Sequence, residues 1–212
     1  MDNHAPETKP AQDKPPDSSP ARSARRARRL IAAIVGLSLL AAAAFVNRRV
    51  ILPARGYVAY TVPSDGMLPT LSGGDRPADT IRVNLRAYQA TDPARCELVV
   101  FEHPFQPETH LISRIAGMPG EAISIRNGET CIGDQSTQIA SSEGPITYTN
   151  AGCLGPGEKL RIPDDSYFML SDNSAVAIDS RFFGPVPRVN LIGRVEKITW
   201  PPNRIRSLLP AQ

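Results

Sequence analysis

Histidine and cysteine are scarce in this sequence, and neither is arranged as a set of metal ligands. The 212 residues include three of each. Cys96, Cys131 and Cys153 form no Cys-x-x-Cys pair and have no clustered histidines beside them, so a zinc site lacks its ligand spacing. We expect no bound metal and no cofactor.

The same shortage limits disulfide bonding to one pair. If the body of the chain is exported, two cysteines could be oxidised. Cys131 and Cys153 share a Gly-rich stretch and are the favoured pair, which leaves Cys96 free in an apolar strand. The alternative is three unpaired thiols that pack as small apolar side chains.

An excess of basic charge is missing from most of the chain. The formal net charge is +3, but residues 1–55 hold 10 Lys and Arg against 4 Asp and Glu. Residues 56–212 hold 14 against 17 and carry a net charge of −3. A nucleic-acid-binding domain needs its basic surface on the folded part, so we exclude that class of partner.

Long apolar runs are absent except for one, at residues 30–46. Its seventeen residues carry no charge, show almost no polar face and approach the length of a bilayer-spanning helix. We predict a single transmembrane anchor at 30–46, preceded by a disordered basic tail at 1–29 and followed by a linker at 47–55.

Arginines flank this run unequally. Five lie between residues 22 and 29, and three lie between residues 48 and 55. The positive-inside rule then places the N-terminus in the cytoplasm and the body on the extracytoplasmic side of the plasma (inner) membrane. The alternatives are a buried core helix and a cleavable signal peptide, but the run is longer than the usual apolar region of a signal peptide.

Prolines are spread along the body, residues 56–212, and they favour strands over long helices. Of the 21 prolines only five lie in the first twenty residues. The apolar runs between turn residues predict an all-β domain with strands at 57–62, 80–85, 97–101, 110–115, 122–126, 167–170 and 191–200.

A hairpin and an excursion complete the prediction for the body. Asn127-Gly128 suits a type I′ turn between the strand at 122–126 and a further strand at 129–132. Residues 133–165 are rich in Gly, Ser, Pro and Thr, which indicates an excursion from the core with short strands and loops.

Four segments follow one another along the body in a recognisable order. The first, residues 63–71, reads Pro-Ser-Asp-Gly-Met-Leu-Pro-Thr-Leu and by itself indicates a rigid turn after a strand. The others are residues 95–101, residues 111–121 with Gly-Met-Pro-Gly, and residues 171–184 with Ser-Asp-Asn and Asp-Ser-Arg. From about residue 62 to residue 202 this order resembles the type I signal peptidase (leader peptidase) family.

The resemblance implies a signal-peptidase-like β domain and a Ser/Lys catalytic site. In that family a serine directly before the Met of the first segment is the nucleophile, and a lysine directly before the Arg of the Gly-x-Pro-Gly segment is the general base. A serine two residues before Asp-Ser-Arg holds that base in place. This chain has Gly66, Ser113 and Ala177 at these positions. Ser64 matches the position whose hydroxyl helps the backbone N–H at residue 66 to form an oxyanion hole.

These substitutions predict a catalytically degenerate member. Acyl transfer needs an attacking oxygen and a base, whereas Gly66 has no side chain and the Ser113 hydroxyl is no base near neutral pH. His110 lies three residues before Ser113, on the opposite face of a regular strand, and His103 lies in a Pro-flanked loop. A displaced nucleophile at Ser64 would need a partner such as Lys159 or Lys197 to reach it, which the spacing does not support.

The last segment contributes polar residues that would support the site. Asp179 and Arg181 lie on one face if their segment is extended. We interpret five residues as turn and ion-pair residues: Asp172, Asn173, Asp179, Ser180 and Arg181.

Three functions are compatible with this interpretation. The first is a membrane-anchored protein that binds exported peptides, such as signal peptides or pilin-like partners, in extended form along residues 60–66 and 110–115 without cutting them. The second is an active signal peptidase that cleaves exported pre-proteins with an atypical nucleophile. The third is a structural membrane scaffold with a vestigial groove.

Overall fold

The computed structural model describes residue 29, residues 32–41, residues 56–141 and residues 144–209. The chain divides into two units, Met1–Val46 and Asn47–Gln212, which are described separately. In the first unit, residues 29 and 32–41 are helical. Among the described residues, no helix has both the length and the apolar character needed to cross a membrane.

The predicted anchor is therefore described only in part. Residues 30–31 and 42–46 of that anchor lie outside the described residues, as do residues 1–28 of the predicted tail and the whole of the predicted linker, residues 47–55. Membrane insertion and the orientation of the chain stay predictions.

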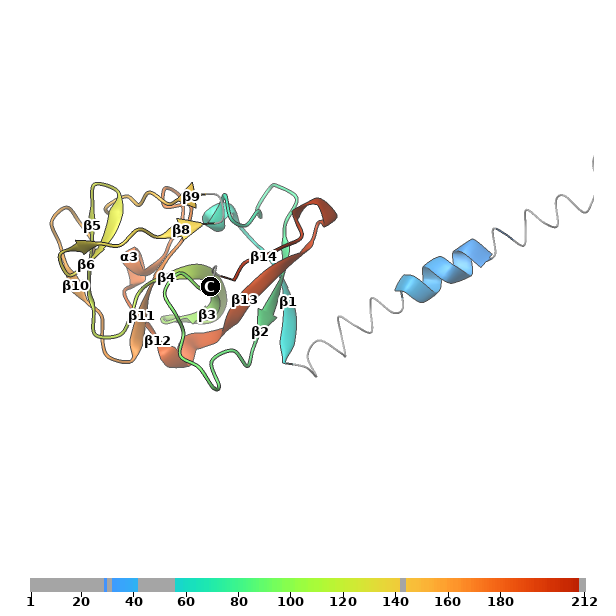
Figure 1. Ribbon diagram of the computed structural model, residues 1–212, viewed down its shortest axis with the longest axis horizontal. Helices are drawn as coiled ribbons and strands as arrows, with labels where there is room; N and C mark the ends of the chain where they lie inside the picture. The colour runs from blue at the N-terminus through green and yellow to red at the C-terminus, as the bar shows by residue number, and fades with distance from the viewer. Residues whose placement is uncertain (1–28, 30–31, 42–55, 142–143, 210–212) are drawn as a thin grey trace, which may run out of the picture. The chain divides into compact units, whose positions relative to one another are not determined.

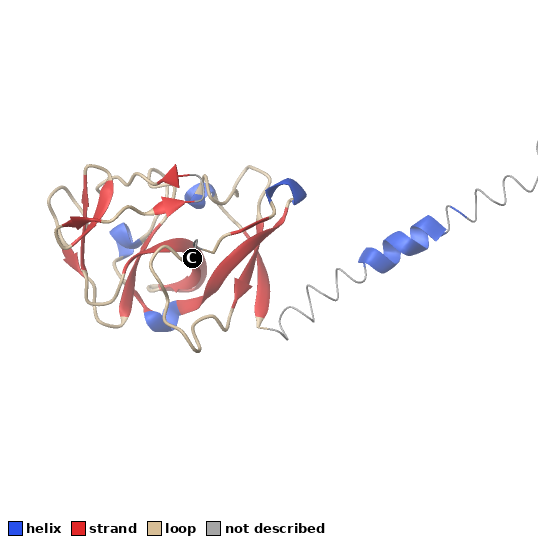
Figure 2. Ribbon diagram, in the orientation of Figure 1, coloured by secondary structure: helices blue, strands red, loops and turns tan. Residues whose placement is uncertain are grey.

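The second unit is mostly β-structure with a few short helices (Figures 1 and 2). Its larger sheet has eight strands, and seven of them run in the order β1-β2-β13-β3-β4-β11-β12 while β14 pairs with β13. Their bounds are β1 Tyr57–Thr61, β2 Thr80–Asn84, β3 Leu98–His103, β4 Gln106–Gly117, β11 Ser166–Leu170, β12 Val186–Pro187, β13 Leu191–Trp200 and β14 Arg206–Ser207.

A four-stranded sheet has the order β10-β5-β6-β7, and β8 pairs with β9. In Figure 1, β5, β6 and β10 gather at one end of the body, whereas β1, β2 and β13 lie at the other end. The bounds are β5 Ala122–Arg126, β6 Glu129–Ile132, β7 Gln135–Ser136, β8 Ala140–Ser141, β9 Gly144–Pro145 and β10 Leu160–Arg161. The short helices are η2 Asp65–Met67, α3 Ser180–Phe183, η3 Arg188–Asn190 and η4 Pro202–Arg204.

The predicted strands and hairpin are confirmed. Each predicted strand overlaps an observed one. β4 begins earlier than predicted, because its first residues are polar and exposed and so show no apolar pattern in the sequence. Asn127 and Gly128 have φ angles of 52° and 83°, and Arg126 pairs with Glu129, as a type I′ turn requires. The excursion at 133–165 holds the short strands β7 to β10.

Apolar side chains of the larger sheet bury the segment that follows β1. Val62, Met67 and Leu71 belong to the same buried cluster as Ile81, Val83, Leu98 and Val100 from the strands. Burial of these side chains in the sheet fixes the path of residues 62–71, which is the segment that forms one wall of the site described below.

Two predictions for the body are wrong. The favoured disulfide is absent, and all three cysteines are free. Cys131 lies in β6 opposite Ser136 of β7, whereas the Cys153 thiol donates to the Ser180 carbonyl. Cys96 lies just before β3 with a φ of 68° instead of inside a strand. The condition set for Asp179 and Arg181, an extended segment, holds only for Asp179, because the residues that follow it form α3 and Asp179 caps the N-terminus of this helix.

Candidate functional site

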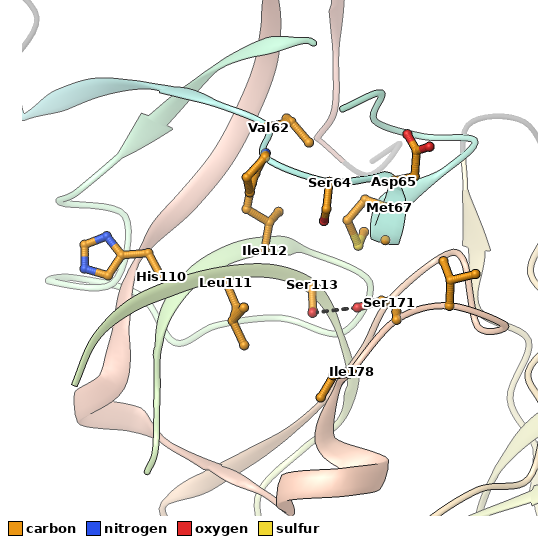
Figure 3. A pocket seen from close by; sticks show the side chains of 14 residues that line it. Val62, Ser64, Asp65, Met67, His110, Leu111, Ile112, Ser113, Ser171 and Ile178 are labelled. Carbon is orange, nitrogen blue, oxygen red and sulfur yellow. Dashed lines mark hydrogen bonds between the residues drawn. The ribbon is translucent and has the colours of Figure 1, made fainter. Parts of the chain in front are cut away.

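A pocket of about 300 Å³ lies between the segment after β1 and the middle of β4. Its walls are residues 62–67 and residues 110–113, and it is completed by Ser171 and residues 176–178. Figure 3 shows these side chains converging from segments that are far apart in the sequence. Three of the four positions singled out from the sequence, Ser64, Gly66 and Ser113, lie in the two walls, and the fourth, Ala177, completes the same pocket.

The wall formed by residues 62–67 is held by backbone and side-chain contacts. Asn173 donates its backbone N–H to the Gly66 carbonyl and its side-chain amide to the Asp65 carbonyl, both at 3.0 Å. A Cβ at Gly73 would lie 2.6 Å from the Ser64 carbonyl oxygen and 2.7 Å from that of Val62. Only glycine permits this close approach, by which residue 73 packs against the backbone of residues 62–64.

Gly66 leaves an open position in the centre of the pocket. A Cβ built on Gly66 would lie 3.6 Å from the Ala177 Cβ and 3.6 Å from the Ser64 Oγ. Both are ordinary van der Waals distances, so a side chain at residue 66 would meet no clash there. The structure thus brings three of the predicted site residues, Gly66, Ala177 and Ser64, side by side.

Ser113 faces these residues from β4. Its hydroxyl shares a hydrogen bond of 3.0 Å with the hydroxyl of Ser171, and both serines are buried (Figure 3). A pair of neutral hydroxyls can donate to and accept from a bound group, but it supplies no base near neutral pH.

The ionisable groups that line the pocket point away from its centre. The Asp65 carboxylate is directed away from Ser113, and its Oδ2 accepts from Arg76 at 3.4 Å (Figure 3). The His110 ring also points away from Ser113, as the alternation along a strand predicts. Neither group is placed to take a proton from a hydroxyl at residue 64 or 113.

The other candidate bases lie elsewhere. Lys159 donates to Asp134 at 2.7 Å beside the four-stranded sheet. Lys197 lies on β13, opposite Arg82 and Ser207. His103 accepts from the backbone N–H of Phe105, outside the pocket lining. In the described part of the chain, no group of three His, Cys, Asp or Glu side chains is placed to hold a metal ion.

A buried ion pair lies directly behind the pocket. Arg114 donates to both carboxylate oxygens of Asp172, at 2.9 Å and 2.6 Å, and Thr70 donates to the same carboxylate at 2.5 Å. Burial alone would lower the pKa of Arg114, but the hydrogen bonds and charge of Asp172 outweigh it and raise the pKa. Asp172 therefore joins the wall of residues 62–71 to β4.

A second buried ion pair, Asp179–Arg181, supports the part of the pocket that contains Ser171. Asp179 and Arg181 are bonded at 2.8 Å and both side chains are fully buried. Asp179 also accepts the Ser171 backbone N–H at 3.0 Å, which fixes the partner of Ser113. The ion-pair prediction for Asp172, Asp179 and Arg181 is confirmed.

Sequence reasoning missed the partners of these groups. The roles of Thr70, Arg114 and Ser171 follow from contacts between residues that are 58 or more positions apart. One signal was available, because Arg114 is a charge close to the apolar residues Ile112, Ile115 and Ala116, and a charge that is buried among apolar residues requires a partner.

Comparison with known proteins gives a family for the chain. The family model for "Signal peptidase, peptidase S26" matches residues 28–200. Signal peptidase I of Leptolyngbya laminosa is 32% identical over 222 aligned residues, which cover 99% of this chain and 96% of that protein. A probable signal peptidase I of Synechocystis sp. is 31% identical, with 68% of this chain and 63% of that protein covered.

A further similar protein is a probable thylakoidal processing peptidase of Arabidopsis thaliana. It is 29% identical, and the match covers 70% of this chain but only 40% of that longer protein. The family model extends over most of the body and includes both walls of the pocket. The chain therefore belongs to the signal peptidase family, peptidase S26.

Proposed function

We propose that this protein is a membrane-anchored member of the family that binds exported peptides in extended form without cutting them. The observation that carries the proposal is the state of the pocket centre. Gly66 offers no side chain there, and the Ser113 hydroxyl is paired with that of Ser171. The pocket is lined by the Ser64, Ser113 and Ser171 hydroxyls and by apolar side chains, but it has no side-chain oxygen at residue 66 and no lysine at residue 113.

The chemistry of acyl transfer explains why these residues would not support turnover. A nucleophile must attack the scissile carbonyl, and a base of suitable pKa must take its proton. Loss of a nucleophile–base unit typically lowers the rate by several orders of magnitude. Ala177 also lacks the hydroxyl that would orient a base at residue 113.

Two strand edges that have no partner strand among the described residues support peptide binding. β1 is the first strand of its sheet and pairs on one side with β2. In β4, residues 110–113 pair with β3, whereas β11 reaches β4 only from Arg114 onward. Because the Ile115 N–H donates to the Glu97 carbonyl, just before β3, alternation directs the backbone groups of Ile112 and His110 to the open side.

An extended peptide can therefore add to either edge through backbone hydrogen bonds. Apolar side chains of Val62, Met67 and Ile112 line the pocket beside these edges and suit small apolar residues of the peptide. The Gly66 backbone N–H and the Ser64 hydroxyl would remain as donors to a peptide carbonyl.

The membrane anchor is part of the proposal. The uncharged run at 30–46 and its excess of arginines on the N-terminal side support a single-pass protein in the plasma (inner) membrane. The body would then meet exported chains, signal peptides among them, on the extracytoplasmic side.

An active peptidase is the second candidate, and one observation favours it. The Ser64 Oγ lies 3.6 Å from the position of a Cβ at residue 66, so a hydroxyl is present beside the place where the family nucleophile would stand. This candidate requires that Ser64 attack the peptide with a base drawn from outside the pocket.

The full chain in detergent micelles tests both candidates with a labelled peptide that carries an Ala-x-Ala site. We expect saturable binding by fluorescence anisotropy and a single intact peptide mass after long incubation. A cleaved product that disappears in Ser64→Ala, but persists in the control Ser136→Ala on the smaller sheet, would establish the active peptidase instead. If the peptide is neither bound nor cleaved, both candidates are contradicted and the structural membrane scaffold is the remaining function.

A further inference from the structure

Tyr60 contacts His110, which is one of the residues that line the pocket. Tyr60 belongs to β1 and His110 to β4, two strands that do not pair with each other. The Tyr60 hydroxyl lies 3.4 Å from the His110 Nδ1, and the two rings are tilted by 58° at a centroid separation of 6.0 Å. The half-buried Tyr60 packs on the sheet core, whereas the His110 ring is exposed.

This pair lies at a defined distance from the pocket centre. His110 precedes Ser113 by three residues, which corresponds to about 10 Å along a strand. A peptide that extends along β4 would bring a side chain to the pair about three residues away from the one beside Gly66. The pair is thus a separate subsite of the same groove.

Protonation of the imidazole changes what the pair offers to a ligand. When His110 is neutral and its Nδ1 accepts from the Tyr60 hydroxyl, only its Nε2–H is left to donate. When His110 is charged, Nδ1–H donates to the Tyr60 oxygen, and both the Tyr60 O–H and the His110 Nε2–H are free to donate. Two donors and a positive charge suit a carboxylate.

The charged neighbours of His110 strengthen this dependence. Glu102 lies opposite it on β3, and Glu108 lies two residues before it at an irregularity of β4, where its φ is 73°. Neither carboxylate is within ion-pairing distance of His110 in the described part of the chain, and Glu102 accepts the Glu108 backbone N–H instead. Asp65 in the same pocket faces Arg76.

While His110 is neutral, these carboxylates repel an acidic side chain of the peptide. The Tyr60–His110 pair therefore attracts such a side chain only when His110 is protonated. Burial raises the pKa of Tyr60, which keeps its hydroxyl protonated as a donor. We infer that Tyr60 and His110 form a subsite for an acidic side chain of the bound peptide, and that it acts when His110 is protonated. This inference rests on the proposed function.

The test compares three peptides that share one Ala-x-Ala site. One carries Gln three residues before and after the site, and the other two replace one Gln by Glu. Affinities for the full chain are measured by anisotropy at about pH 5.5 and about pH 8, which bracket the range where imidazole gains its proton while the Glu side chain stays ionised. We expect one Glu peptide to bind about fivefold more tightly at the lower pH and the Gln peptide to show no such change.

Two variants assign the effect. His110→Gln should abolish the pH dependence of the Glu peptide, whereas His103→Gln, which changes the other histidine of the body, should keep it. If both Glu peptides follow the Gln peptide in the parent chain, or if His110→Gln retains the pH dependence, the subsite is wrong and the proposed function stands. If no peptide binds at either pH, the proposed function is contradicted and the subsite with it.

Discussion

Single side chains decide the chemistry of this pocket. Gly66 has no side chain, Ala177 has only a methyl group, and the Ser113 hydroxyl is hydrogen-bonded to that of Ser171. The surrounding contacts hold the walls of the pocket in place, from the Asn173 bonds to the buried ion pairs. The backbone around these positions is thus well supported, although residue 66 carries no side-chain oxygen and residue 113 is not a lysine.

A serine at residue 66 should be accepted without loss of stability. The Cβ would lie in open space at ordinary contact distances, so Gly66→Ser is expected to change the free energy of unfolding by less than about 1 kcal/mol. Chemical denaturation of the parent and the variant measures this. A loss of more than about 2 kcal/mol would show that the space at residue 66 is not available.

The buried Arg114–Asp172 pair should be much more sensitive. Removing Arg114 leaves a buried carboxylate without its partner, so Arg114→Met is expected to cost about 3–5 kcal/mol of unfolding free energy. The double variant Arg114→Met/Asp172→Leu, which removes both charges, should recover a large part of this loss. Urea denaturation of the three chains decides it, and equal stability of parent and single variant would contradict the account.

At the scale of elements, the position of one loop determines whether the groove exists. Residues 62–71 pass from β1 over the sheet core and back, and the close approach at Gly73 depends on the missing Cβ. A shift of this loop would move Ser64 and Gly66 away from β4. Loop geometry and peptide binding should therefore change together.

Gly73→Ala tests that coupling. The added methyl would meet backbone atoms of Val62 and Ser64 at less than 3 Å, so the loop must move, and peptide affinity should fall by about tenfold or more. Gly155→Ala is the matched control, because its Cβ would meet only the flexible side chain of Glu158. Unchanged affinity in Gly73→Ala would separate the loop from binding.

The strands could be predicted from the sequence because their signals are local. Alternating apolar residues and turn residues mark β1, β2 and β5, and the positive φ angles of Asn127-Gly128 follow from side-chain chemistry alone. The position of Cys153 could not be predicted in this way. It depends on a backbone bond to Arg181, 28 residues further along, which draws it toward α3 and away from β6.

The candidate site was predictable only through the family resemblance. Nothing local distinguishes Gly66 from a turn glycine or Ser113 from any strand serine, and their meeting in one pocket depends on contacts between β1, β4 and the segment before α3. The Asp172 partner of Arg114 is 58 positions away, so only the three-dimensional structure identifies the pair.

At the scale of the whole molecule, the account requires an anchored chain. We expect the full protein to sediment with membranes and to stay there after alkaline carbonate extraction, because a seventeen-residue uncharged segment releases poorly from a bilayer. Immunoblotting of the fractions measures this. Recovery of the full-length chain in the carbonate supernatant would contradict the anchor and the proposed location.

The orientation of the body follows from the same segment. External protease added to spheroplasts should remove the body and leave a short N-terminal fragment, as the arginine bias on the N-terminal side predicts. A body that is protected until the cells are lysed would place it in the cytoplasm, away from exported peptides.

The central claim, binding without cutting, is tested most directly by mass spectrometry of one peptide after incubation with two chains. The parent and the variant Gly66→Ser/Ser113→Lys/Ala177→Ser are saturated with the same Ala-x-Ala peptide, and bound and cleaved fractions are measured together. We predict that the parent binds the peptide and returns it intact, while the variant, which regains an attacking oxygen and a base, releases a fragment cut at the Ala-x-Ala site. A fragment cut at that site by the parent would contradict the account.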